Sequence, residues 1–323
     1  MTNGWLYEEG IGESRAILIE GGEIVEAMIE LPGPHGPGAV IAAKLIKVQQ
    51  PGRRGLVRLA DGAEALLAPI PPGVTEGATL NVEIVREPLP ETGRLKRAKV
   101  RPADGPPRPA PNLAERLNAR PHPATGPDLF EQAGWSELIE SALTGDIAFP
   151  GGSLTMSLTP AMTLFDVDGI LDPAALAIAG ARAAGQAIRR FGLGGSIGID
   201  LPTLAAKAER QAAAEALDAV LPQPFERTAV NGFGFLQVVR RRGRRSLPEI
   251  LQADPVGAAA RALLRRAERA GPGALTLTAA PEVIACISPE WRAALERRTG
   301  GALALRADAA LAISAGHVHR SQN

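Results

Sequence analysis

The chain has 323 residues, of which 45% are hydrophobic and 22% are charged, so it can hold two or three domains and is not a disordered protein. Its formal net charge is zero, and its single cysteine, Cys286, excludes an internal disulfide and a CxxC zinc motif. The N-terminus lacks the basic and apolar regions of a signal peptide, and arginines interrupt the most apolar run. We therefore expect a cytoplasmic protein without a membrane span.

The first third of the chain has the pattern of short β-strands. Residues 14–31 predict a hairpin around Gly21-Gly22. Between residues 38 and 101, five short strands alternate with turns, which suits a small OB-type barrel. No aromatic residue occurs between residues 38 and 101, so stacking of bases on the barrel is not supported. The barrel can therefore either bind RNA with its basic rim or serve only in packing.

The rest of the chain alternates between helices and strands. Residues 102–127 contain eight prolines and predict a linker or a wrapping segment. A helix is expected at residues 128–143, followed by two adjacent strands. From residue 172 onward, helices and strands alternate, which predicts a parallel or mixed sheet covered by helices.

These patterns predict a mixed α+β protein of the α/β class. We expect four parts, bounded as follows: residues 1–37 together with 102–150, a barrel at 38–101, a sheet with helices at 151–254, and a small domain at 255–323.

Two strands end in carboxylates that have no evident capping task. The run "MTLFDVDG" contains Asp166 and Asp168, and the run "SIGIDL" contains Asp200. Asp172 before Pro173 and Thr203 are better placed to cap the following helices. Parallel strands joined by a helix place their carboxyl ends side by side, where two carboxylates repel each other unless a cation lies between them. Mg²⁺ suits such a pair because it takes one or two carboxylates together with water and phosphate oxygens.

An arginine-rich run follows the second carboxylate. Residues 1–35 carry seven Glu and one Arg, whereas residues 86–101 and 226–247 are strongly basic. The segment "GFGFLQVVRRRGRRSL" contains five arginines within six residues: Arg240, Arg241, Arg242, Arg244 and Arg245. Such runs are often solvated surface. If the preceding strand continued through this arginine run, Arg240, Arg242 and Arg244 would share one face of the strand and could bind phosphates.

These segments resemble the catalytic core of the ribonuclease E/G family of bacterial endoribonucleases. The resemblance is closest over residues 134–250. Three segments, in the same order along the chain as in the family, carry it: "WSELIESALTGDIAFPGGSLTMSLTPAMTLFDVDG", "RRFGLGGSIGIDL" and "GFGFLQVVRRRGRRSL".

The resemblance implies both a site and an architecture. Asp166 and Asp200 would be the Mg²⁺ ligands, and Asp168 would take the place of a family asparagine that supports the metal site. Metal-activated water would cleave single-stranded RNA and leave a 5′-phosphate and a 3′-hydroxyl. The first 130 residues would form a ribonuclease-H-like subdomain interrupted by the OB-type barrel. A deoxyribonuclease-I-like catalytic subdomain and a small C-terminal domain would follow.

The sequence also departs from the family. The zinc-binding CxxC is missing, so we expect no structural zinc, and residues 102–127 are too few for the family's 5′-end-sensing domain. Gly232 occupies the place of an arginine. The leading hypothesis is a Mg²⁺-dependent endoribonuclease. The alternatives are a non-catalytic RNA-binding protein with the same fold and, third, an assembly protein whose small domain forms a homodimer.

Overall fold

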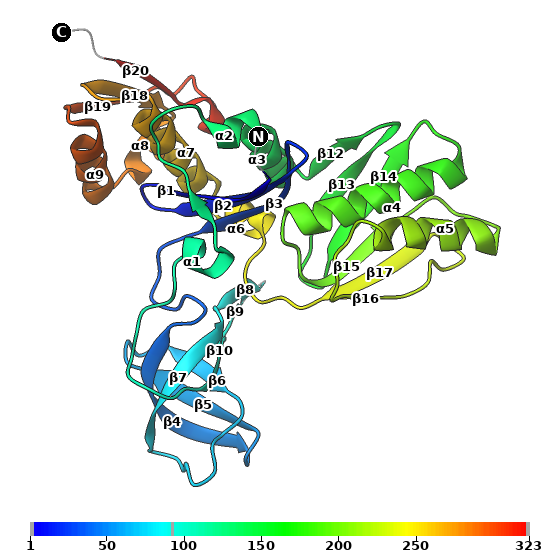
Figure 1. Cartoon of the computed structure of the whole chain (residues 1–323), viewed down its shortest axis with the longest axis horizontal. Coiled ribbons are helices and arrows are strands. Elements are labelled where there is room, and N and C mark those ends of the chain that lie inside the picture. The colour runs from blue at the N-terminus through cyan, green and yellow to red at the C-terminus, as the bar shows by residue number, and fades with distance from the viewer. Residues whose placement is uncertain (1–2, 92–93, 321–323) are drawn as a thin grey trace. The chain divides into compact units, whose positions relative to one another are not determined.

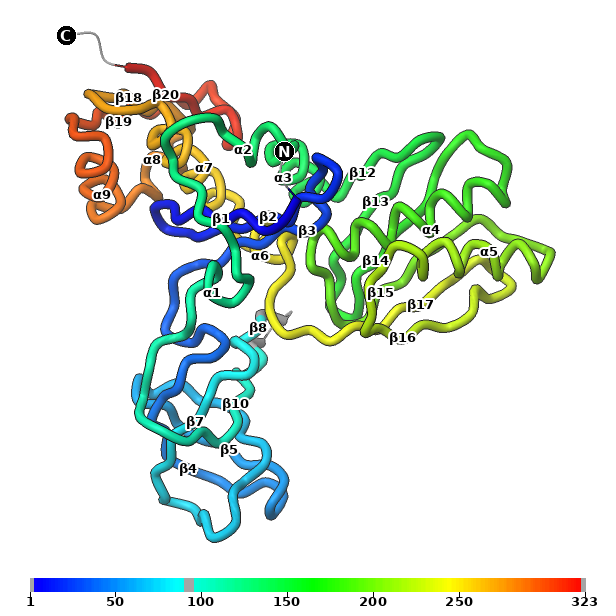
Figure 2. The backbone as a smooth tube through the Cα atoms, in the orientation of Figure 1, coloured from blue at the N-terminus to red at the C-terminus, as the bar shows by residue number. Residues whose placement is uncertain are grey.

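The computed structural model describes residues 3–91 and 94–320, so the ends of the first and last predicted domains, residues 1–2 and 321–323, lie outside the described residues. The chain forms two compact units (Figures 1 and 2). The first unit comprises Met1–Pro32, Leu117–Arg240 and Ser246–Asn323, and the second comprises Gly33–Arg116 and Arg241–Arg245. The mixed α+β class is confirmed, with several sheets and a small barrel.

The first unit begins with a four-stranded sheet in the order β11-β1-β2-β3. The predicted hairpin is confirmed as β2 (Ser14–Glu20) and β3 (Glu23–Glu30). Strands β1 (Gly4–Glu9) and β11 (Arg120–Pro121) were not predicted. β11 lies in the proline-rich segment and pairs with β1 over only two residues, which is too short for a hydrophobic period to reveal.

The second unit is a closed barrel of five strands in the order β10-β6-β5-β4-β7. Its strands are β4 (Val40–Gln50), β5 (Arg54–Leu59), β6 (Glu64–Leu67), β7 (Thr79–Arg86) and β10 (Ala98–Pro102). The short strands β8 (Leu89–Glu91) and β9 (Arg94–Lys96) pair separately. The proline-rich segment wraps the barrel, because Arg108 exchanges backbone hydrogen bonds with Val40 before α1 (Leu113–Leu117) begins.

A six-stranded sheet in the order β12-β13-β14-β15-β17-β16 dominates the first unit. Its strands are β12 (Asp146–Phe149), β13 (Gly152–Leu158), β14 (Thr163–Gly169), β15 (Gly195–Asp200), β16 (Glu226–Arg227) and β17 (Phe235–Arg240). Only β14 and β15 run parallel, because the long helix α4 (Pro173–Arg190) connects them, whereas the other neighbours are antiparallel.

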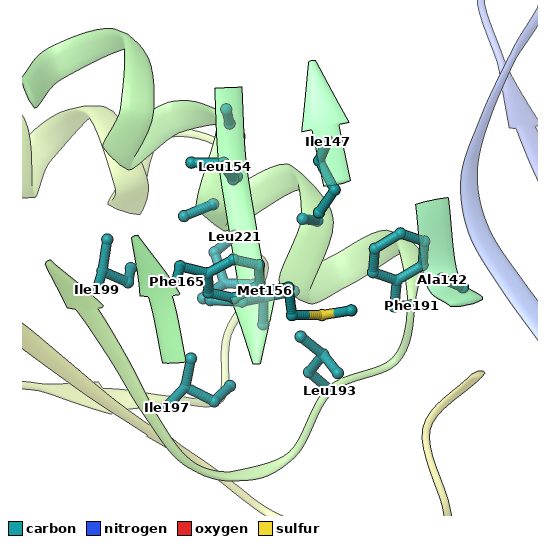
Figure 3. Close-up of a cluster of buried hydrophobic side chains, with 14 of the residues drawn as sticks. Ala142, Ile147, Leu154, Met156, Phe165, Phe191, Leu193, Ile197, Ile199 and Leu221 are labelled. Atoms are coloured by element: carbon teal, nitrogen blue, oxygen red, sulfur yellow. The ribbon is translucent and has the colours of Figure 1, made fainter. Parts of the chain in front are cut away.

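Helices cover one face of this sheet. In Figure 1, α4 and α5 (Lys207–Asp218) lie side by side on it. The apolar side chains of alternate strand residues point toward these helices and form the core in Figure 3, which includes Leu154, Phe165 and Ile199. The small residues of α4 permit close packing, since a Cβ on Gly180 would lie 2.4 Å from the Val167 side chain.

The two helix caps expected after the carboxylates have different outcomes. The cap at Asp172 is confirmed, because its Oδ1 accepts hydrogen bonds from the N–H groups of Ala174 and Ala175, both at 3.2 Å. The cap at Thr203 is wrong. Helix α5 begins only at Lys207, and the Thr203 hydroxyl donates instead to the carbonyl of Phe233 at 3.4 Å.

The remaining elements complete the first unit. The predicted helix at residues 128–143 is split at Gly134, whose φ of 90° ends regular helix, into α2 (Leu129–Gln132) and α3 (Trp135–Thr144). After α6 (Leu247–Ala253), the last segment forms a three-stranded sheet, β19-β18-β20, with its own core. Its elements are α7 (Pro255–Arg269), β18 (Leu275–Ala279), α8 (Pro281–Cys286), α9 (Pro289–Thr299), β19 (Leu303–Ala307), η1 (Ile313–Ala315) and β20 (His317–Arg320).

None of the helices within residues 3–91 and 94–320 has the length and apolar character needed to cross a membrane.

Candidate active site on the six-stranded sheet

The uncovered face of the six-stranded sheet carries the two predicted carboxylates next to each other. Asp166 of β14 and Asp200 of β15 are direct partners in the parallel ladder. Neighbouring strands lie about 4.8 Å apart, so the two side chains leave the same face within reach of one ion. Both residues are exposed, whereas Phe165 and Ile199 beside them point into the core. The expectation that the strands bring these carboxylates together is confirmed.

The position of the pair differs from the expected one in one respect. Asp200 is the last residue of β15, but β14 continues for three residues beyond Asp166, to Gly169. The pair therefore lies on the open face of the sheet and not beyond the ends of both strands. Asp168 shares this face, two residues along β14, opposite Ser153 of β13.

Sequence reasoning missed three residues of the same row, which are Asp146, Thr155 and Phe235. The ladder aligns Asp146 with Thr155, Thr155 with Asp166, and Asp200 with Phe235. Asp146 is therefore a third exposed carboxylate in the row, two strands from Asp166, and Phe235 is the ring directly beside Asp200. No pattern within one strand could have shown this, because the row exists only across four strand pairings.

The pair fits a small hard cation. In the described part of the chain, no ion pair or hydrogen bond engages the carboxylates of Asp166, Asp168 or Asp200, so their lone pairs face solvent. Over the same ranges, no three His, Cys, Asp or Glu side chains come together as a complete set of metal ligands. Two adjacent carboxylates without a caging third ligand match the preference of Mg²⁺, which keeps several waters and phosphate oxygens in its shell.

Arg240 does not join the carboxylates. It pairs with Gly195 at the opposite end of β15, five residues along β17 from Phe235, which corresponds to about 17 Å. Its guanidinium donates to the carbonyls of Ile188 and Leu193 at 3.4 and 3.3 Å, near the C-terminus of α4. Burial lowers the pKa of Arg240 below its ordinary value. This arginine therefore satisfies one carbonyl of the last turn of α4 and one carbonyl of the loop that follows it, on the covered side of the sheet.

The expectation that Arg240, Arg242 and Arg244 share a strand face is wrong. Strand β17 ends at Arg240, and Arg241–Arg245 packs with the barrel unit. There the backbone N–H of Arg245 donates to Glu87 at 2.9 Å, and Arg242 and Arg244 are half-buried. The chain leaves the sheet after Arg240, since Arg241–Arg245 belongs to the compact unit of the barrel, so strand geometry does not continue through the run.

Arg241 instead joins a group of cations on the barrel unit. Burial lowers the pKa of Lys99, and the nearby charges of Arg86, Lys96, Arg54 and Arg241 lower it further. Arg86 is only 7% exposed and donates to the carbonyl of Arg97, so we call the three exposed residues of this group, Arg54, Lys99 and Arg241, the barrel cation cluster. Arg54, Lys99 and Arg241 are exposed, so the cluster offers positive charge to a polyanion in solution.

Comparison of the sequence with models of known protein families and with curated proteins finds no match.

Proposed function

We propose that the protein is a Mg²⁺-dependent endoribonuclease of the ribonuclease E/G type that cleaves single-stranded RNA. The observation that carries this proposal is the in-register pairing of Asp166 and Asp200 on an exposed sheet face. The two carboxylates would hold one Mg²⁺ with most of its shell open to water and to the scissile phosphate. The bound ion would supply an activated water and neutralise charge on the phosphate.

The chain's own residues have separate tasks in this proposal. Asp166 and Asp200 would hold the cation, and Asp168 and Thr155 beside them would accept or donate hydrogen bonds to its water. The barrel cation cluster binds RNA phosphates without regard to base sequence. A five-stranded closed barrel is also the architecture of OB folds, which bind oligonucleotides. We extend the proposal to the whole architecture: the sheet β11-β1-β2-β3 as a ribonuclease-H-like subdomain, and the six-stranded sheet as a deoxyribonuclease-I-like one.

A non-catalytic RNA-binding protein is the second candidate, and one observation favours it. Arg240, the one arginine of the run that lies in the same unit as the carboxylates, is on the helix side of the sheet, so it supplies no phosphate-binding partner to Asp166 and Asp200 on the other face. In this alternative, the barrel cation cluster would bind RNA and the carboxylate pair would take no part in chemistry.

The deciding experiment is a cleavage assay on end-labelled single-stranded RNA with Mg²⁺ or with EDTA. We expect Mg²⁺-dependent cleavage that falls by about 100-fold or more in Asp166→Asn and Asp200→Asn, because each removes one of two ligands to the ion. Asp146→Asn is the matched control: it is an exposed carboxylate in the same row, two strands from Asp166, and should cleave within a few-fold of wild type.

Each outcome of this assay separates the two candidates. RNA binding without cleavage in the wild-type protein would favour the non-catalytic candidate. Undiminished cleavage by Asp200→Asn would refute the assignment of the ion to this pair.

A further inference from the structure

Exposed apolar side chains gather at the end of the sheet that carries the carboxylates. Within the described residues, four large apolar side chains are exposed: Ile170 (94%), Leu171 (38%), Phe233 (84%) and Val239 (46%). Ile170 and Leu171 follow the end of β14, Phe233 lies in the turn before β17, and Val239 lies toward the other end of β17. Single exposed apolar residues are ordinary, but an apolar rim beside two unpaired carboxylates is not.

Phe233 is exposed on a turn whose backbone is tightly held. The Asn231 side chain accepts hydrogen bonds from the N–H groups of Phe233 and Phe235 at 2.9 and 3.0 Å. The Gly234 N–H donates to the Asn231 carbonyl, and the Leu201 N–H donates to Gly234 at 3.2 Å. The turn is thereby fixed to the chain that leaves Asp200, so the ring projects into solvent from a rigid support.

Gly234 makes this attachment possible. Its φ is 94°, and a Cβ there would lie 2.1 Å from the carbonyl oxygen of Leu201. Only glycine permits both the left-handed backbone and the close approach. The turn at Gly234 and the segment at Leu201 therefore meet at van der Waals distance directly after Asp200.

Phe235 extends the same surface onto the sheet. It is the ladder partner of Asp200, and its ring lies over Gly198, where a Cβ would be 2.6 Å from its Cζ. The absence of a side chain at Gly198 leaves room for the ring on the open face next to Leu164, whose Cδ2 would be 2.8 Å from the same Cβ. Phe233 and Phe235, which we call the aromatic shelf, thus border the carboxylate pair.

We propose that the aromatic shelf stacks an unpaired base of the RNA next to the phosphate that the carboxylate pair receives. This inference rests on the proposed function. Aromatic faces bind any unpaired base, and the barrel offers none between residues 38 and 101. A base held on Phe233 would lie beside the carboxylate pair, because Phe233 precedes Phe235, the ladder partner of Asp200, by two positions and its turn is hydrogen-bonded to Leu201 next to Asp200. A paired base cannot reach the ring, so the shelf selects single strands.

The test measures binding of a short single-stranded RNA in EDTA, so that no cleavage occurs. We expect Phe233→Ala to weaken binding by about 5- to 150-fold, which is the range for loss of one base–aromatic stack. Phe233→Tyr keeps the ring and should bind within a few-fold of wild type. Phe233→Leu keeps apolar volume without a π face and should resemble Phe233→Ala.

Val239→Ala is the matched control, because Val239 is an exposed apolar residue on the same face at the far end of β17. It should bind RNA like the wild type. Stacking would be overturned in favour of a general apolar contact by either of two results. One is a loss of RNA affinity in Val239→Ala equal to that in Phe233→Ala, and the other is wild-type RNA affinity in Phe233→Leu. Unchanged binding by Phe233→Ala would overturn the proposal outright.

Phe233→Trp gives a direct signal, because an indole that stacks on a base loses fluorescence. We expect quenching on addition of single-stranded RNA and none in Val239→Trp. If the wild-type protein cleaves RNA and Phe233→Ala does not change RNA binding, the stacking proposal is refuted and the proposed nuclease function is not. If RNA quenches the fluorescence of Phe233→Trp but the wild-type protein does not cleave RNA, the proposed nuclease function is refuted and the stacking proposal is not.

Discussion

A buried ion-pair network in the first unit allows a sharp prediction about stability. Glu8 of β1 and Arg15 of β2 are each 2% exposed, and Glu8 Oε2 lies 2.6 Å from Arg15 Nη2. The same oxygen accepts a hydrogen bond from Arg269 of α7 at 2.8 Å. The Arg15 guanidinium also lies over the rings of Phe130 and Trp135, at 4.6 and 5.1 Å from their centroids. Glu8 thus forms ion pairs with two arginines at once, and Arg269 also pairs with Asp128.

The change Glu8→Gln removes this charge and keeps the volume. Burial already lowers the pKa of Arg15 to about 10 against the opposing attraction of Glu8, so its positive charge is costly in this place. Removing one partner of a buried pair costs about 3–5 kcal/mol, because the other charge remains buried and unpaired. For a unit of this size, that loss lowers the melting temperature by roughly 6–20 °C.

The assay is thermal and urea unfolding followed by tryptophan fluorescence, since Trp135 lies inside the network. Glu20→Gln is the matched control, because Glu20 lies on β2 and also pairs with an arginine, Arg189, at 2.7 Å. The Glu20 side chain is half-exposed, so the free energy of unfolding should fall by only about 0–1 kcal/mol. If Glu8→Gln were as stable as Glu20→Gln, water would replace Glu8 as the partner of Arg15 at no cost, and the predicted penalty for an unpaired buried charge would be refuted.

Two further predictions concern RNA affinity and pH. The double change Lys99→Ala with Arg241→Ala should reduce the slope of log affinity against log salt by about 1.4, whereas Lys207→Ala, an exposed lysine of α5, should leave it unchanged. An unaltered slope in the double variant would mean that the barrel cation cluster does not contact phosphates. Burial raises the pKa of Glu13 above 4.5, against the lowering effect of Arg15 and Arg261. Its carboxyl therefore contributes stability that is full at low pH and is lost as the pH rises through the raised pKa. The free energy of unfolding of wild type should thus fall relative to Glu13→Gln from about pH 4.5 toward neutrality, and a flat or opposite difference would contradict this.

Local patterns were sufficient for several elements. Alternating apolar residues around Gly21-Gly22 predicted the hairpin, and five such runs between turns predicted the barrel strands, because a half-exposed strand must alternate to bury one face. Asp172 before Pro173 predicted the start of α4, since both residues act within one turn of the helix. The carboxylates of Asp166 and Asp200 could likewise be assigned to strands.

Features that depend on pairing could not be predicted in this way. The placement of Asp146 and Phe235 in the row of the carboxylates follows from the hydrogen-bond register of four strand pairs. A one-residue slip in any of them would have moved a side chain to the other face. The end of β17 at Arg240 is also a tertiary outcome, because the following residues leave the sheet and pack with the barrel unit.

The arginines of α7 show the same limit most clearly. Arg261, Arg265 and Arg269 recur every four residues, a spacing that in sequence is typical of a solvated helix face. In the structure they are nearly buried, because Glu8, Glu13 and Asp128, more than 130 residues earlier in the chain, supply the opposite charges. The sequence by itself determined where charged and apolar side chains fall along each element. Whether a charge faces water or a partner was decided only by folding, since burial depends on which distant residue arrives to pair with it.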